Sequence, residues 1–180
     1  MKTPRKELES RLIKHARGDV GGTEKTRNQA GWIEKYWPRT SYPEGYKNRE
    51  PYCAAACVYW LWAFLFELAK DGLLKDVFGT EDFAVLEKWR CKSARAFDWR
   101  DWGRKAKGVK VLDETAKALP GDFVVFDFSH IGLVIEDRGK TILTIEANTN
   151  TEGSRDGDGC WQKIRARPLV QCFVRVLPEK

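Results

Sequence analysis

The sequence predicts an α+β fold, with helices in the first part of the chain and strands in the second. Helical spacing of apolar residues dominates up to about residue 110, and short β-branched or aromatic runs separated by turn residues follow Pro120-Gly121. The segment Tyr52–Lys70 is apolar almost all round, so we expect a buried helix that packs on one face of the sheet. With 180 residues and no internal repeat, the chain has the size of a single domain.

The helical part is expected to begin with a helix from Pro4 to about Arg17, because proline suits the first helical position and Gly18 can end the helix. A second helix, capped by residues 21–23, carries aromatic and apolar residues at helical spacing: Trp32, Ile33, Tyr36 and Trp37. A loop over 38–51 precedes the buried helix. A polar helix from about Glu81 to Ala94 and a basic, tryptophan-containing stretch to Lys110 follow it.

The second part of the chain predicts an antiparallel meander of about five strands. The expected strands are Phe123–Phe128, Ile131–Glu136, Thr141–Ala147, Cys160–Ala166 and Val170–Leu177. The turn Asp156-Gly157-Asp158-Gly159 lacks the longer run of oxygen ligands and the distal glutamate of a calcium loop. We therefore interpret it as a connection between strands.

Net charge favours anionic partners without identifying one. The formal charge is +6, and residues 88–110 hold 9 Lys and Arg against 2 Asp and Glu. Nucleic acid, an anionic membrane surface and an acidic cell-wall polymer all fit this charge. Trp89, Phe97, Trp99 and Trp102 alternate with basic residues, as in platforms that stack single-stranded nucleic acid. We expect these aromatic rings to pack inward, with the charges solvated, and no nucleic acid to bind.

Cellular location and redox state are predicted from the same composition. The N-terminus has no apolar core after its charges, so we expect no secretory signal peptide and synthesis in the cytoplasm. The longest apolar run, Cys53–Phe66, is 14 residues and too short to span a bilayer, so we expect a soluble protein without membrane insertion. Five cysteines are too few, and odd in number, for a disulfide scaffold.

Cys53 is a candidate nucleophile because it lies in the first turn of the predicted buried helix. Unpaired N–H groups and the helix dipole stabilise a thiolate there. A thiolate also needs a base, and the chain has only two histidines, His15 and His130. His15 lies in a polar helix and is expected to be solvated. The commoner fate of such a cysteine is simple packing, which we assign to Cys57.

His130 begins a predicted strand, and the following hairpin predicts its neighbours. A three-residue loop, Asp137-Arg138-Gly139, with Gly139 left-handed would place His130 opposite Glu146. Side-chain alternation would put Asn148 on the same face. A two-residue loop would instead put Ala147 opposite His130. In the first register a carboxylate and an amide lie beside the imidazole, and either can hold its tautomer.

The chain resembles the CHAP domains, cysteine- and histidine-dependent amidohydrolases and peptidases within the NlpC-type, papain-like peptidoglycan hydrolases. The resemblance covers most of residues 20–177. It lies in Pro51-Tyr52-Cys53-Ala54-Ala55, Lys92–Phe97 with Trp102-Gly103, Pro120–Phe126, His130–Val134, Ile145–Asn150 and Asp156–Gly159. Cys57 is not part of the family pattern, Ala147 stands where the family often has Gly, and the first twenty residues and Arg39–Glu50 match less well.

The resemblance implies a papain-like fold in which residues 21–180 form the catalytic domain and residues 1–20 a helical extension. It implies a cysteine peptidase or amidase that cuts an amide bond of bacterial cell-wall peptide through an acyl-enzyme, without a cofactor. The implied roles are nucleophile for Cys53, base for His130, orienting acid for Glu146 and an amide partner for Asn148. Tyr52, Trp60 and Ser129 are weaker candidates for oxyanion or substrate contacts.

Other functions and the biological setting stay open at this stage. The alternatives are a non-catalytic wall-binding module, an amidase acting on a protein, and a nucleic-acid-binding domain. We expect a monomer that binds peptidoglycan and no metal, because no second Cys/His pair accompanies Cys53 and Cys57. Release by a phage holin and delivery as an antibacterial effector, the latter with an immunity protein as partner, both suit a wall hydrolase without a leader.

Overall fold

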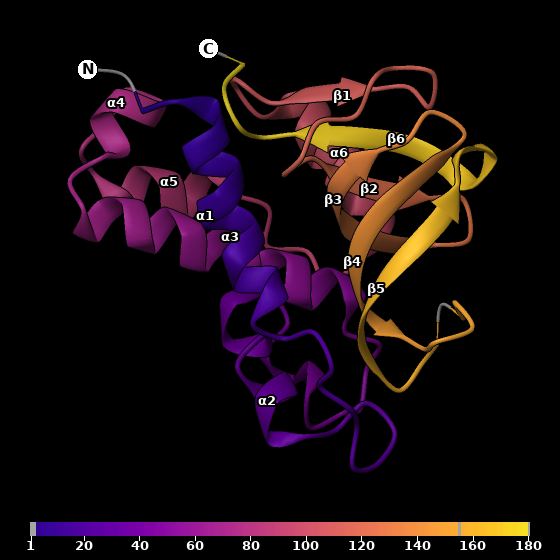
Figure 1. Cartoon of the computed structure of the whole chain (residues 1–180). Helices are drawn as coiled ribbons and strands as arrows, with labels where there is room; N and C mark the ends of the chain where they lie inside the picture. The colour runs from indigo at the N-terminus through magenta and orange to yellow at the C-terminus, as the bar shows by residue number, and fades with distance from the viewer. Residues whose placement is uncertain (1–2, 155, 180) are drawn as a thin grey trace.

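The helices cover a six-stranded antiparallel sheet, as Figure 1 shows. The computed structural model describes residues 3–154 and 156–179. Its helices are α1 (Arg5–Arg17), α2 (Gly31–Glu34), α3 (Cys53–Lys70), α4 (Leu74–Phe78), α5 (Phe83–Trp89) and α6 (Ala96–Lys105). Its strands are β1 (Lys110–Leu112), β2 (Phe123–Phe126), β3 (His130–Asp137), β4 (Thr141–Thr149), β5 (Gly159–Ala166) and β6 (Val170–Arg175). The predicted α+β class is confirmed.

The order of the strands, β1-β6-β2-β3-β4-β5, corrects the predicted meander. Strands β2 to β5 do follow one another, but β6 pairs with β2 instead of β5, and the short β1 adds a sixth strand beyond β6. Burial explains this order. Almost every residue of β6 is buried, which requires neighbours on both edges, whereas exposed residues alternate along β5 and suit an edge strand.

A buried ion pair fixes β6 beside β2. The guanidinium of Arg175 donates to both carboxylate oxygens of Asp122, at 2.8–3.2 Å, just before β2 begins. Asp122 has no exposed surface, so this carboxylate depends on its partner for compensation of its lost hydration.

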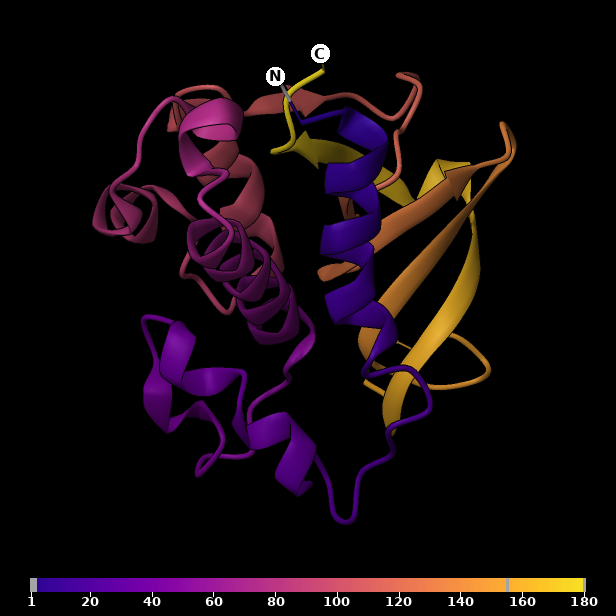
Figure 2. The same cartoon turned by 60° about the vertical axis from the view of Figure 1, so that its left-hand side comes forward.

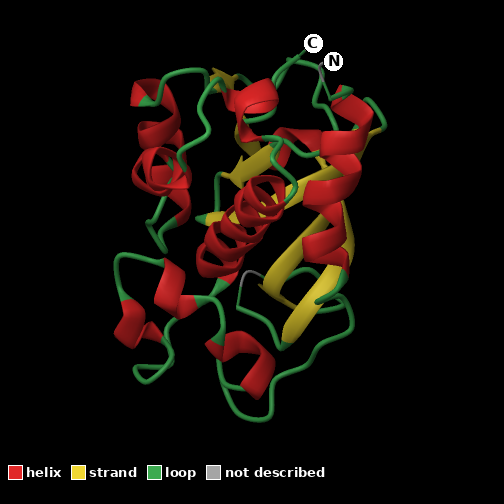
Figure 3. Ribbon diagram, turned by 90° about the vertical axis from the view of Figure 1, so that its left-hand side faces the viewer, coloured by secondary structure: helices red, strands yellow, loops and turns green. Residues whose placement is uncertain are grey.

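Helix α3 forms the centre of the main core, as predicted from its apolar sequence. It packs against β3 and β4, with α1 alongside it, and Figure 3 shows it crossing in front of the strands. Figure 2 shows α1 running beside α3, and both helices contact β3. Ile131, Leu133 and Ile145 face this core, and a smaller apolar cluster around Phe126 and Val134 lies on the other face of the sheet.

The remaining helices are shorter than predicted. The second helix shrinks to α2 and a 3-10 turn at Trp37–Arg39, since Pro38 interrupts it. The polar helix expected from about Glu81 to Ala94 is only α5, which the Asp82 carboxylate caps by accepting the Ala84 N–H at 2.8 Å. The short helix α4, which ends at Gly79 with φ of 76°, lies before it and was not predicted. The basic stretch contains an unpredicted helix, α6.

The tryptophans of the basic stretch pack inward, as expected. Trp99 is fully buried, and Trp89 and Trp102 are half-buried and contact each other edge to face. The indole N–H of Trp102 donates to the Trp89 carbonyl, and that of Trp89 donates to the Lys107 carbonyl. These rings therefore fasten α5 to α6.

The first twenty residues share the main core with the rest of the chain. Leu8 and Leu12 of α1 are fully buried in it, and the segment after α1 pairs with β5 through hydrogen bonds between Gly21 or Gly22 and Cys160. Asp19 is buried and accepts the Tyr36 hydroxyl at 2.7 Å and the Trp60 indole at 2.8 Å. The packing thus shows no break at residue 20.

We predict that Asp19→Ala destabilises the protein. The substitution leaves the Tyr36 hydroxyl, the Trp60 indole and the paired Lys35 ammonium without their acceptor, and should lower the free energy of unfolding by roughly 2–4 kcal/mol. Urea denaturation measures this. Glu34→Ala, at an exposed position of α2, is the control and should change the value by less than about 0.5 kcal/mol. Equal effects of the two substitutions would contradict the prediction.

Candidate active site

Cys53 is the first residue of α3, where the helix meets the end of the sheet. The chain enters the helix through Pro51, and a proline before the first turn removes only an N–H that has no helical partner. The Cys53 side chain is almost buried, since the residue is 7% exposed. The backbone N–H groups of Ala54 and Ile131 face its sulfur. Both groups favour the negative charge of a thiolate.

His130 is the first residue of β3 and is completely buried. Its Nε2 lies 3.0 Å from Oε2 of Glu146, a residue of β4 that is also completely buried. Nδ1 is therefore the ring nitrogen left for Cys53, whose thiol interacts with the imidazole. The structure thus brings together the thiol, the imidazole and the carboxylate that the sequence analysis selected.

The register behind this contact differs from both predicted registers. Gly139 is left-handed as expected, with φ of 78°, but the turn is closed by Arg138 and Thr141, and a bulge follows between Val134 and Glu136. Leu133 then pairs with Ile145, which brings Gly132, and not His130, level with Glu146. Glu146 reaches His130 diagonally along the same face of the sheet.

Gly132 leaves the space through which the Glu146 side chain passes. A Cβ at residue 132 would lie 2.6 Å from the Glu146 Cγ and 2.9 Å from the Ile145 carbonyl oxygen. Any side chain at this position would therefore displace either the carboxylate or the strand.

Arg165 of β5 belongs to this cluster, and the sequence analysis did not identify it. Its Nε lies 2.9 Å and 3.1 Å from the two oxygens of Glu146, and its Nη2 also bonds to Oε2. The connection between β4 and β5 is too long for turn chemistry to set a register, so no local signal placed Arg165 opposite the carboxylate. The only available signal was an arginine within a predicted strand.

The pKa values of the three titrating groups shift together. Burial would raise the pKa of Glu146, but Arg165 and His130 outweigh it and lower this pKa to about 2. Burial would lower the pKa of His130, but Cys53 and Glu146 raise it to about 9. Burial would likewise raise the pKa of the Cys53 thiol, yet His130 and the two N–H groups lower it. These directions favour a thiolate–imidazolium pair beside an ionised carboxylate.

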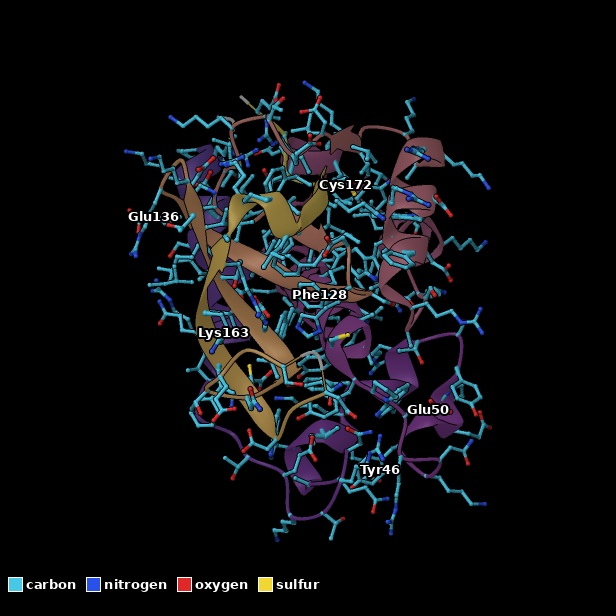
Figure 4. The ribbon with its side chains drawn as sticks, turned by 90° about the vertical axis from the view of Figure 1, so that its right-hand side faces the viewer. Tyr46, Glu50, Phe128, Glu136, Lys163 and Cys172 are labelled. Carbon is cyan, nitrogen blue, oxygen red and sulfur yellow. The ribbon has the colours of Figure 1, made fainter. Side chains whose placement is uncertain are left out.

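Two aromatic rings line the other side of the imidazole. Phe128 stacks on His130 with ring centroids 5.8 Å apart, and Phe126 stacks on it at 6.1 Å. The Arg165 guanidinium lies 5.4 Å and 5.5 Å from the same two rings. Figure 4 labels Phe128, on the connection between β2 and β3. This apolar wall limits the access of water to the charged groups.

Asn148 is the extra residue of a bulge in β4 and has φ of 57°. The bulge interrupts the alternation of side chains along β4, on which the predicted placement of Asn148 depended. Asn148 is buried, its carbonyl accepts the Gly157 N–H at 3.2 Å, and its own N–H faces the Tyr52 hydroxyl. The partner role that the resemblance implies for its side chain remains a prediction.

Tyr52 and Trp60 are both completely buried, and the oxyanion or substrate contacts expected of them remain predictions. The Tyr52 hydroxyl lies against Glu24, and burial raises its pKa. The Trp60 indole donates to Asp19 in the core. Ser129, with φ of 60°, is exposed beside the site.

The other candidate groups lie outside this cluster. His15 is half-buried instead of solvated, with its Nε2 2.9 Å from Glu67 Oε2. All five cysteines are free and buried, and burial raises the pKa of Cys57.

Among the described residues, no group of three His, Cys, Asp or Glu is placed to hold a metal ion. By length and composition α3 is long and apolar enough to cross a membrane, which corrects the expectation from the 14-residue apolar run, and 67% of it is buried inside the protein.

A groove of about 870 Å³ opens over Cys53. The loop before α3 forms one wall, the start of α6 and the segment before it form the other, and Ser129 lies at the rim. Its lining residues are Trp37, Ser41, Tyr42, Glu50, Pro51, Cys53, Ser93, Ala94, Arg95, Ala96, Phe97, Asp98 and Ser129. Figure 4 shows Glu50 on the loop that precedes α3. A chain-like substrate can therefore reach the sulfur from an open surface.

Comparisons with protein-family models and with curated proteins returned no match. The resemblance to CHAP domains accordingly depends on the residues and motifs given above.

We predict that Cys53 reacts with iodoacetamide at pH 6–7, where an ordinary thiol is largely protonated. The lowered pKa of Cys53 supplies thiolate at this pH, and the imidazolium persists until the pH rises through about 9, the pKa of His130. In His130→Ala the thiol pKa should rise, and the rate at pH 6.5 should fall by about tenfold or more. Mass spectrometry of the labelled peptide measures the rate.

Cys57→Ala is the control for this labelling, and it should leave the rate unchanged. A wild-type profile that titrates as an ordinary thiol would contradict the predicted ion pair.

Proposed function

We propose that this protein is a cysteine peptidase or amidase that cleaves an amide bond in the peptide of bacterial peptidoglycan. The observation that carries the proposal is the cluster of Cys53, His130 and Glu146, of which Cys53 lines an open groove. The shifted pKa values of the three groups suit a charged nucleophile. The resemblance to CHAP domains, and the papain-like fold it implies, supplies the substrate class.

The proposed reaction begins from the thiolate–imidazolium pair. The Cys53 sulfur attacks the carbonyl carbon of the amide and forms a tetrahedral intermediate. The imidazolium of His130 gives its proton to the leaving nitrogen as the C–N bond breaks, which leaves a thioester and a free amine. Water then loses a proton to His130 and attacks the thioester; as the C–S bond breaks, a carboxylic acid is released and the thiolate–imidazolium pair is restored.

The start of α3 is suited to stabilise the oxyanion of both tetrahedral intermediates. The Cys53 N–H is at the first helical position, where no carbonyl lies one turn earlier in the helix to accept it. The positive end of the helix dipole also points at the developing charge. Glu146 and Arg165 keep the imidazole oriented during the reaction.

The charges of the groove suit a zwitterionic peptide. Glu50 and Arg95 line it, and within the described part of the chain neither side chain has a hydrogen-bond or ion-pair partner. Peptidoglycan stem peptides carry free carboxylates and amino groups, which these two side chains can bind. The excess of positive charge over the whole chain, +6, also favours approach to an anionic wall. A protein amide with similar charges is the alternative substrate.

Within this proposal the protein acts at the cell wall as a monomer. It reaches its substrate either by release through a phage holin or by delivery as an antibacterial effector, and the second route predicts an immunity protein that blocks the groove.

We predict that Cys53→Ala abolishes hydrolysis of purified sacculi while the fold survives. Loss of the nucleophile should reduce the rate by about 10⁴-fold or more. Mass spectrometry of the released muropeptides measures the activity and identifies the bond. Cys57→Ser is the matched control, one helical turn away, and should keep wild-type products. If sacculi treated with Cys53→Ala release the same muropeptides as sacculi treated with the wild type, the proposal is wrong. If the wild-type protein releases no muropeptides, a protein substrate or a wall-binding role is favoured.

We further predict that Arg95→Ala raises KM for a soluble stem peptide by about fivefold and changes kcat little, because an exposed charge–charge contact contributes about 1 kcal/mol to binding. Steady-state kinetics on the peptide and on its carboxyl-amidated form measure this. Lys88→Ala, an exposed basic residue that does not line the groove, is the control. Equal loss of affinity in the two variants would indicate a general charge effect and contradict the role of Arg95.

A further inference from the structure

Arg165 contacts more polar groups than a simple ion pair requires. Its guanidinium is buried, with 8% of the side chain exposed, and it holds both oxygens of Glu146. Nη1 donates to the Gly153 carbonyl at 2.7 Å, and Nη2 lies 3.3 Å from the Thr149 hydroxyl. All three guanidinium nitrogens therefore have a hydrogen-bond partner, which fixes the plane and position of the group.

The contacts of Arg165 determine how the Glu146 carboxylate is turned. Oε1 accepts the Thr144 hydroxyl at 2.5 Å and the Nε of Arg165, and Oε2 faces both Arg165 and Nε2 of His130. Without Arg165, His130 would be the only cation within the described residues beside a completely buried carboxylate. Such a carboxylate gains a proton or rotates toward another donor, and either change weakens its hold on the imidazole.

The other side of Arg165 is attached to the connection between β4 and β5. The Thr149 hydroxyl donates to the Ser154 carbonyl at 2.6 Å, and the Asn150 side chain accepts the N–H groups of Gly153 and Ser154 at 2.7 Å and 2.9 Å. These bonds form a compact turn whose Gly153 carbonyl receives Arg165. The arginine is thus held from outside the cluster while it holds Glu146.

We propose that Arg165 is a positioning residue of this site, which keeps the Glu146 carboxylate ionised and turned toward His130 so that the imidazole stays charged beside Cys53. This inference depends on the thiolate chemistry of the proposed function but not on which amide is cut. The titratable groups that face this network are Cys53 and Cys57 from α3, His130 from β3, Glu146 from β4 and Cys160 from β5. Cys57 and Cys160 stay neutral thiols, because burial raises the pKa of each.

The test is the pH profile of Cys53 alkylation by iodoacetamide in Arg165→Met and Arg165→Lys. In Arg165→Met the profile should move to higher pH by about one unit, so that the rate at pH 6.5 falls about tenfold. Arg165→Lys keeps the positive charge without the bidentate contact to Glu146 and should recover part of the rate. In a Glu146→Gln background, Arg165→Met should cause little further change, since the group through which it acts is gone.

Arg175→Lys is the matched control for a merely structural effect. Arg175 also makes a bidentate contact with a buried carboxylate, that of Asp122. Its contacts do not include the three residues of the candidate site. This variant should lose stability in thermal denaturation and keep the wild-type profile. If Arg165→Met does not fold, the comparison of Arg165→Lys with Arg175→Lys decides the question.

The outcomes separate the two proposals. A wild-type thiolate profile that is unchanged in folded Arg165 variants, or additive effects of Arg165→Met and Glu146→Gln, would overturn the role of Arg165 alone. An altered profile in the Arg165 variants, together with sacculi that the wild-type protein leaves intact, would support the role of Arg165 and contradict the peptidoglycan substrate. An ordinary thiol profile in the wild type would overturn both.

Discussion

The burial of one ionised carboxylate is the constraint on which the candidate site depends. Removing a carboxylate from water costs several kcal/mol even after relaxation, so Glu146 is tolerated only because cationic and neutral donors surround it. The donors come from β3, β5 and β4 itself. Three neighbouring strands must therefore be in register before the charge is compensated, and the same register places His130 at the N-terminus of α3. Sheet pairing and thiol chemistry are consequently linked through a single group.

The sequence predicted the main elements and the central contact, although the predicted register was wrong. The helix at Cys53, the alternating strands and the side on which Glu146 lies follow from local periodicity, which the structure preserves. The observed register differs from the expected one by two residues, and side chains of a strand return to the same face every second residue. Glu146 therefore remained on the face of His130. A difference of one residue would have turned it away.

What the sequence did not reveal was determined by distant parts of the chain. The place of β6 beside β2 depends on burial of both its faces and on the pairing of Arg175 with Asp122, which no turn encodes. Arg165 lies beyond a long connection, so its partner was not predictable from spacing. The burial of Tyr52 and Trp60 reflects Glu24 and Asp19, residues of the N-terminal segment whose packing against α3 has no local signal.

The two ends of the described chain meet on the side of the molecule that is opposite the loop bordering the groove (Figure 1, Figure 2). Arg5 donates to the carbonyls of Leu177 and Pro178, each at 2.9 Å, and so holds the first helix against the last residues. A short linker can therefore join the ends for circular permutation without stretching the fold. An affinity tag or a surface anchor attached at either end would likewise leave the groove uncovered, so the protein can be immobilised with its cleft facing outward.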